Sequence, residues 1–77
     1  MKTDPRMPRF NPTPRLSPRE REVLPLVATM GLKQVAPRLG IQYKTAAAHK
    51  YNLMRKLDLH TQMDLTLYAV REGFVTP

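Results

Sequence analysis

The chain has 77 residues, no cysteine and a formal net charge of +7 at pH 7. A chain of this length forms one small domain that buries only about 60% of its unfolded surface. It has neither thiols for a disulfide or zinc site nor an apolar run near the roughly 20 residues of a membrane span. We therefore expect a soluble, intracellular protein without cofactor or metal, and its charge favours a polyanionic partner.

Residues 1–15 are rich in proline and basic side chains. They hold four of the eight prolines of the chain, and proline removes a backbone donor and fixes φ. We expect a flexible, disordered basic arm over residues 1–15 and one folded domain over residues 16–77. The arginines of the arm either reach a DNA groove or stay in a solvated tail.

The first helix is predicted to begin after Ser17. The order Ser17-Pro18-Arg19-Glu20 is typical of a capping box, in which Ser17 and Glu20 each accept from the backbone N–H of the other. Pro25 falls inside this helix, where we expect a kink or a local widening rather than a break. The apolar spacing continues through it, in Val23, Leu24, Val27 and Met30.

The second predicted helix spans residues 32–39. Gly31 either ends the first helix or caps this one, and Gly40 ends it. Pro37 removes one hydrogen bond of the helix. The predicted inward side chains are Val35, Ala36 and Leu39, and the predicted outward ones are Lys33, Gln34 and Arg38.

The third predicted helix, residues 43–57, has one apolar and one free face. The apolar positions, at helical spacing, are Ala46, Leu53 and Leu57, with His49 between them as a packed histidine rather than a metal ligand. The opposite face holds Lys44, Ala47, Ala48, Tyr51 and Arg55. Residues 31–57 contain six Lys or Arg and no acid, so this helix is the expected contact to a polyanion.

The fourth predicted helix begins after Thr61, with Asp64 as a weaker capping partner, and ends at Gly73. Two apolar stripes lie on roughly opposite sides of it. One contains Met63, Leu67 and Val70, and the other contains Leu65, Tyr68 and Ala69. One stripe fills the core, and the other forms a dimer surface or packs within the domain. The candidate interface residues are Met63, Leu65, Leu67, Tyr68 and Val70.

Several segments together carry a family resemblance. They are Leu16–Leu24, Lys33–Ala36 and Tyr68–Gly73, with Leu39, Thr45, His49, Asn52, Lys56 and Leu57. In these residues the chain resembles the LuxR/GerE family of helix-turn-helix DNA-binding domains, from about residue 16 to residue 75. The resemblance implies an all-α fold of four helices, in which the second and third form the helix-turn-helix. The third would enter the major groove, and the fourth often makes the dimer contact.

The resemblance also implies how a signal reaches the protein and where in the cell the protein acts. The chain resembles the short stand-alone, GerE-like members, so a signal would arrive through synthesis, degradation or a partner. We expect a cytoplasmic protein of a bacterial or phage type that joins the nucleoid when bound to DNA.

The third helix departs from the family pattern Ser-x-x-Thr-Val-Lys/Arg-x-His. Gln42 replaces the capping serine, and Ala47 replaces the basic residue that commonly reaches base edges. Expected phosphate contacts are Lys33, Lys44, Thr45, Lys50, Arg55 and Lys56. Expected base-reading residues are Gln42, Tyr43, Ala47, Ala48 and Tyr51; the alternative for these is a plain solvent-exposed helix surface.

Two functions follow as hypotheses. The first is a transcription regulator that binds a specific DNA duplex as a homodimer. The second is a degenerate helix-turn-helix module that no longer reads bases and instead binds and modulates a larger regulator protein. An enzyme is not expected, because Glu20, Glu22, His49 and His60 form no recognisable nucleophile–base or metal spacing.

Overall fold

The computed structural model describes residues 15–76 and folds them into four helices without a strand. The helices are α1 (Pro18–Thr29), α2 (Leu32–Leu39), α3 (Tyr43–Leu57) and α4 (Gln62–Arg71). The all-α, four-helix prediction is confirmed. The predicted arm at residues 1–15 lies outside the described residues, apart from Arg15.

The first turn of α1 contains the predicted capping box. The N–H of Glu20 donates to Oγ of Ser17 at 3.0 Å, and the N–H of Ser17 donates to Oε1 of Glu20 at 2.8 Å. The helix continues through Pro25, and Oγ1 of Thr29 donates to the Pro25 carbonyl at 2.8 Å. Proline is therefore accommodated without ending the helix.

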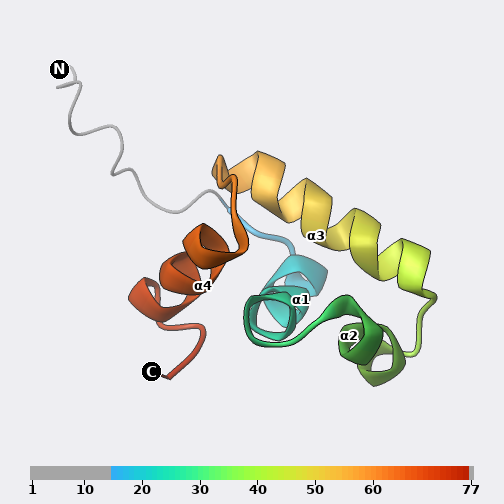
Figure 1. Ribbon diagram of the computed structural model, residues 1–77. Coiled ribbons are helices and arrows are strands. Elements are labelled where there is room, and N and C mark those ends of the chain that lie inside the picture. Colours follow the sequence, from blue (N-terminus) through green and yellow to red (C-terminus); the bar gives the residue numbers. More distant parts are fainter. Residues whose placement is uncertain (1–14, 77) are drawn as a thin grey trace, which may run out of the picture.

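The α1 helix is the centre of the domain, because each of the other three helices packs against it. Figure 1 shows α1 between α4 and α2, with α3 lying across them. The buried core takes side chains from all four helices and from Leu16. Its members are Leu16, Val23, Leu24, Val27, Ala28, Val35, Ala36, Ala46, Leu53, Leu65 and Ala69.

A tight glycine turn sets α3 against α2. Gly31 is the N-cap of α2, which settles the two readings of this glycine. At the other end Gly40 has φ 68°, a left-handed conformation that glycine adopts without steric cost. The N–H of Ile41 then donates to the Ala36 carbonyl at 3.0 Å, which completes a Schellman-type end.

The start of α4 is capped by Thr61. Oγ1 of Thr61 accepts from the N–H of Asp64 at 3.0 Å. The Asp64 carboxylate accepts at 3.4 Å from the N–H of His60. The expected reciprocal partner was the N–H of Thr61, so this half of the box is shifted by one residue.

Two polar side chains of α4 hold it to the end of α1. Nε2 of Gln62 donates to the Val27 carbonyl at 3.0 Å, and Oγ1 of Thr66 donates to the Ala28 carbonyl at 2.8 Å. The last carbonyls of a helix have no partner within that helix, so these bonds satisfy groups that would otherwise need water. They fix where α4 begins relative to α1.

Candidate nucleic-acid interface

The α3 helix divides into a packed face and a free face, as its spacing predicted. Ala46 and Leu53 are 0% and 1% exposed. Ala47 is half-buried. The exposed side chains on the opposite face are Lys44, Ala48, Tyr51 and Arg55. Two of these four are cations, one is an aromatic ring and one ends at a methyl group.

The start of α3 is open to solvent. Gln42, its N-cap residue, is exposed and its side chain makes no capping hydrogen bond. Tyr43 and Thr45 are also exposed, and the ring of Tyr43 is 54% exposed. The structure therefore places these three predicted contact residues on the surface at the turn between α2 and α3.

The α2 helix, which packs against α3, also carries basic side chains. Lys33 and Arg38 are exposed on α2, whereas Lys50 of α3 is half-buried. No acidic residue occurs between residues 31 and 57, so no carboxylate of the segment itself opposes these charges. Such a surface attracts phosphate groups.

Tyr51 and Arg55 form a contact on the free face. The guanidinium carbon of Arg55 lies 5.7 Å from the ring centroid of Tyr51, within the range of a cation–π interaction. The ring remains 63% exposed. The two residues are four apart in sequence, which places them one turn apart on the same side of a helix.

Lys56 is engaged within the domain. Its ammonium lies 2.9 Å from Oε1 of Glu20, the same atom that accepts the N–H of Ser17. The backbone N–H of Ser17 and then the Lys56 ammonium lower the pKa of Glu20. This bond joins the end of α3 to the start of α1, so Lys56 shares its charge with Glu20 rather than offering all of it to a phosphate.

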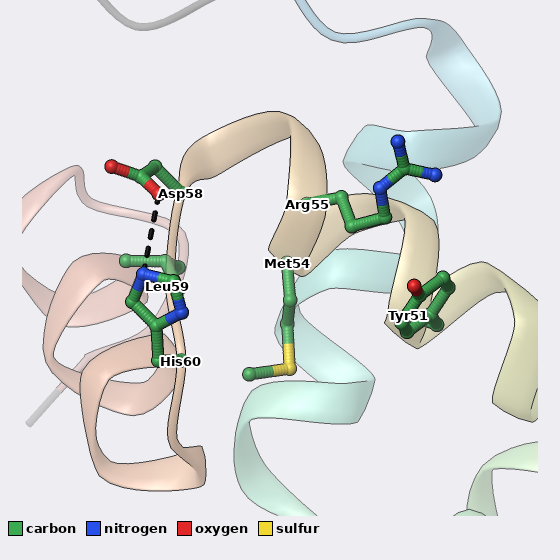
Figure 2. Close-up of a pocket in the computed structure, with 6 residues that line it drawn as sticks. All are labelled: Tyr51, Met54, Arg55, Asp58, Leu59 and His60. Atoms are coloured by element: carbon green, nitrogen blue, oxygen red, sulfur yellow. Dashed lines mark ion pairs between the residues drawn. The ribbon is translucent and has the colours of Figure 1, made fainter.

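A hollow of about 430 Å³, which no pattern in the sequence predicts, lies where α3 ends. Figure 2 shows Tyr51 and Arg55 on one side of Met54, and Asp58 and His60 on the other. Nε2 of His60 lies 3.2 Å from Oδ1 of Asp58. The residues that line the hollow are Tyr51, Met54, Arg55, Asp58, Leu59 and His60. They come from the last turns of α3 and from the link that follows it, so helical spacing alone could not have grouped them.

The outward stripe of α4 is the one that contains Met63 and Leu67. These side chains are 65% and 53% exposed, and Val70 is half-buried. Leu65 is 0% exposed, and Tyr68 is half-buried against the core. Including Leu65 among the interface candidates was therefore wrong, because its side chain is already buried within the domain. Only the exposed part of the Tyr68 side chain remains available to a partner chain.

Other kinds of site find no support in the part of the chain that the structure describes. Among residues 15–76, no three His, Asp or Glu side chains gather as a metal site would require. His49 is half-buried on the inner side of α3. Within the same range, every helix is too short or too polar to cross a bilayer.

Comparison with known proteins agrees with this geometry. The family described as bacterial regulatory proteins, luxR family, matches residues 14–69. The oxygen regulatory protein NreC of Staphylococcus haemolyticus (strain JCSC1435) is 45% identical over 58 residues, which cover 74% of this chain and 27% of that protein. NreC of Staphylococcus carnosus (strain TM300) is 43% identical with the same coverage.

The chain thus spans about a quarter of the length of these relatives. The family match covers most of the described residues, including all of α1, α2 and α3. The chain therefore belongs to the luxR family of bacterial regulatory proteins and carries the helix-turn-helix DNA-binding domain of that family.

Proposed function

We propose that this protein regulates transcription by placing α3 in the major groove of a specific DNA duplex, as a homodimer held by α4. The observation that carries the proposal is the free face of α3. Four of its side chains are exposed, it lies opposite the buried Ala46 and Leu53, and it belongs to a segment of 27 residues without a carboxylate. A helix about 10–12 Å wide with its side chains fits the B-DNA major groove.

The proposed DNA contacts are of two kinds: contacts to phosphates, which position the domain, and contacts to bases, which read the sequence. Lys33 in the first turn of α2, and Lys44 and Thr45 in the first turn of α3, are exposed and would bind phosphates. Lys50 and Lys56 would add to them from the flanks, Lys56 only in part because of Glu20. For base reading, the proposal keeps Gln42, Tyr43, Ala47, Ala48 and Tyr51, of which the alanines would contact thymine methyl groups.

Dimerisation would use the outward stripe of α4. Met63 and Leu67 are two of the four large apolar side chains that the described residues leave exposed, and they are one turn apart on α4. A monomer of this size makes few phosphate contacts, so two copies on two half-sites would supply the affinity and site selection. A C₂ pair would bring the same stripe of each copy together.

The test of this function is selection from a random duplex pool at about 150 mM salt, where non-specific phosphate contacts are weakened. An enriched sequence with two related halves is the expected result, and their separation gives the half-site spacing. Enrichment of a single unrepeated half would contradict the dimer but not DNA reading.

A second function is favoured by two features taken together: the short side chains of Ala47 and Ala48 on α3, and the exposed apolar stripe of Met63 and Leu67 on α4. In this alternative the domain binds a larger regulator through α4 and reads no bases. Absence of any enriched sequence, together with a tight complex with such a regulator, would support the alternative over the first proposal.

The dimer is tested separately by Leu67→Glu, which places a charge on the outward stripe. Sedimentation velocity should show a monomer for this variant and a dimer for the unaltered protein. Gln34→Glu is the matched control, since it adds the same charge to an exposed position of α2. Equal sedimentation of Leu67→Glu and the unaltered protein would remove α4 from the proposal.

A further inference from the structure

We propose that Arg55 is a base-reading residue, which contacts a guanine near the end of each half-site, and that Tyr51 is the positioning residue for its guanidinium. This inference rests on the proposed DNA-binding function. It assigns to Arg55 a role different from the phosphate contact that its charge alone suggests, and it replaces direct base reading by Tyr51 with the positioning of Arg55.

The position of Arg55 on α3 is the first argument. Arg55 follows the fully buried Ala46 by nine residues, which at 100° per residue places it on the opposite side of the helix, at about 180°. Lys50, by the same count, lies about 40° from Ala46 and is half-buried. Of the basic residues late in α3, Arg55 is therefore the one that points furthest from the core.

The second argument is that Arg55 has its charge available. Lys56 is paired with Glu20 at 2.9 Å, and Asp58 lies 3.2 Å from His60. No ion pair joins Arg55 to any carboxylate of residues 15–76. Its contact is instead the face of the Tyr51 ring, 5.7 Å from centroid to guanidinium carbon. A cation on an aromatic face keeps all its N–H donors in the guanidinium plane for other partners.

The third argument is what the first half of α3 lacks. Ala47 and Ala48 have no hydrogen-bonding side-chain atom, so the centre of the free face offers methyl groups only. Tyr51 and Arg55 are the next residues along that face, about 6 Å and 12 Å beyond Ala47 at the helical rise of 1.5 Å per residue. Between Lys44 and Tyr51 this face therefore has no hydrogen-bonding side chain, and Arg55 is the cation beyond that gap.

The chemistry favours guanine as the base. Guanine presents two acceptors, N7 and O6, to the major groove, and the two-pronged guanidinium matches them with two parallel hydrogen bonds. A flexible arginine must lose rotamer freedom to make this contact. Stacking on Tyr51 restricts the guanidinium before DNA arrives, so less freedom remains to be lost.

The experiment uses the full chain and the duplex that the random-pool selection enriches. Binding is measured for the selected duplex, for duplexes in which each guanine is changed to another base, and for duplexes that contain 7-deazaguanine, which lacks the N7 acceptor. For the unaltered protein we expect about a 10- to 100-fold loss of affinity at one guanine, the discrimination of a two-bond contact. For Arg55→Ala this guanine should no longer matter.

Lys44→Ala is the matched control, because it removes one charge from the same face of α3. It should weaken binding to all duplexes alike and leave the guanine preference intact. Tyr51→Phe keeps the ring face and should keep the preference, whereas Tyr51→Leu should reduce it at the same base pair that Arg55→Ala affects. Circular dichroism confirms that each variant is folded.

Three results have distinct meanings. Failure of the unaltered protein to enrich any sequence would refute the proposed function itself. An enriched sequence with uniform weakening by Arg55→Ala, as for Lys44→Ala, would show that Arg55 binds phosphate and would overturn this inference alone. A guanine preference that disappears in Arg55→Ala but survives in Tyr51→Leu would show that Tyr51 does not position Arg55, while the base-reading role of Arg55 would stand.

Discussion

The helices of this domain begin in two different ways. At the start of α1 and α4, the side chains of Ser17 and Thr61 accept hydrogen bonds from backbone N–H groups three residues later. At the start of α2 and α3, Gly31 and Gln42 supply no such bond. The first pair packs together as a scaffold, and the second pair is the helix-turn-helix. Local sequence thus specifies the scaffold more strongly than it specifies the two helices of the helix-turn-helix, α2 and α3.

The stability of α2 and α3 must therefore depend on packing against the rest of the domain. The α2 helix has only 8 residues, and a helix of that length is not stable alone in water. It is held by contacts with α3 and α1. The uncapped N–H groups of α3 remain for water or for an anion, which suits a helix whose proposed partner carries phosphates.

The largest effect should come from removing the packing that holds α3. Leu53 is 1% exposed in the core, so Leu53→Ala should lower the free energy of unfolding by about 2–5 kcal/mol, through lost burial and a cavity. Urea denaturation followed by circular dichroism measures it. A domain this small could lose most of its stability.

The control for Leu53→Ala is Leu67→Ala, which makes the same chemical change at a side chain that is 53% exposed. Measured at a protein concentration where the chain is monomeric, it should change stability by no more than about 0.5 kcal/mol. A similar loss of unfolding free energy in both variants would mean that the buried side chain of Leu53 contributes no more to stability than the exposed side chain of Leu67.

The capping difference is tested by a pair of variants. Ser17→Ala removes the side-chain acceptor from the first turn of α1 and should cost about 1 kcal/mol. Gln42→Ala removes a side chain that caps nothing, and should be close to neutral. Thermal unfolding of both proteins compares them. If Gln42→Ala proved as costly as Ser17→Ala, the two helix pairs would not differ in the way proposed.

Local patterns predicted the scaffold and the division of α3 into two faces. The capping residues, the glycine turn at Gly40 and the buried positions Ala46 and Leu53 all follow from spacing of a few residues. The resemblance of short motifs to a known family then predicted the four-helix fold and the family, and the family match confirmed the family.

Tertiary partners could not be predicted in the same way. The bond between Glu20 and Lys56 joins residues 36 apart in sequence, and nothing in either local segment requires it. The two apolar stripes of α4 have similar composition, so only the packing against α1 decides that Leu65 is buried while Leu67 is exposed. The hollow beside Met54 likewise depends on how the chain turns after α3. Base contacts remain predictions, because they depend on DNA as well as on the protein.

A smaller effect is expected from the bond that joins the scaffold to α3. The pKa of Glu20 is lowered in the folded state, first by the Ser17 N–H and then by Lys56. Its carboxylate therefore stabilises the fold above the ordinary value of 4.5, and this contribution is lost as the pH falls through the lowered pKa. Glutamine at this position still fits a capping box, so Glu20→Gln removes mainly the charge.

The measurement for Glu20→Gln is the free energy of unfolding as a function of pH. The unaltered protein should exceed the variant by less than about 1 kcal/mol at neutral pH, as for a partly exposed ion pair. The difference should shrink as the pH falls below 4.5. A difference that stays the same down to the acid limit would assign the effect to shape and not to charge.

The smallest effect should come from Tyr68→Phe. The ring of Tyr68 packs against the core, but its hydroxyl is buried without a hydrogen-bond partner among the described residues. A buried polar group without a partner gives no net stabilisation, so removing this hydroxyl should leave the monomer unchanged or more stable by up to about 1 kcal/mol. Urea denaturation at low protein concentration measures it, with Tyr51→Phe as the control for an exposed ring.

The same variant also sharpens the proposed role of α4. The Tyr68 hydroxyl is buried within the monomer, so a second copy cannot reach it, and Tyr68→Phe should affect at most the stability of the monomer but not the dissociation constant of the dimer. Sedimentation equilibrium at several concentrations separates the two effects, because only the second depends on concentration. An unchanged dissociation constant would place the dimer contact on the exposed side chains of Met63 and Leu67 alone, which is the arrangement that their exposure favours.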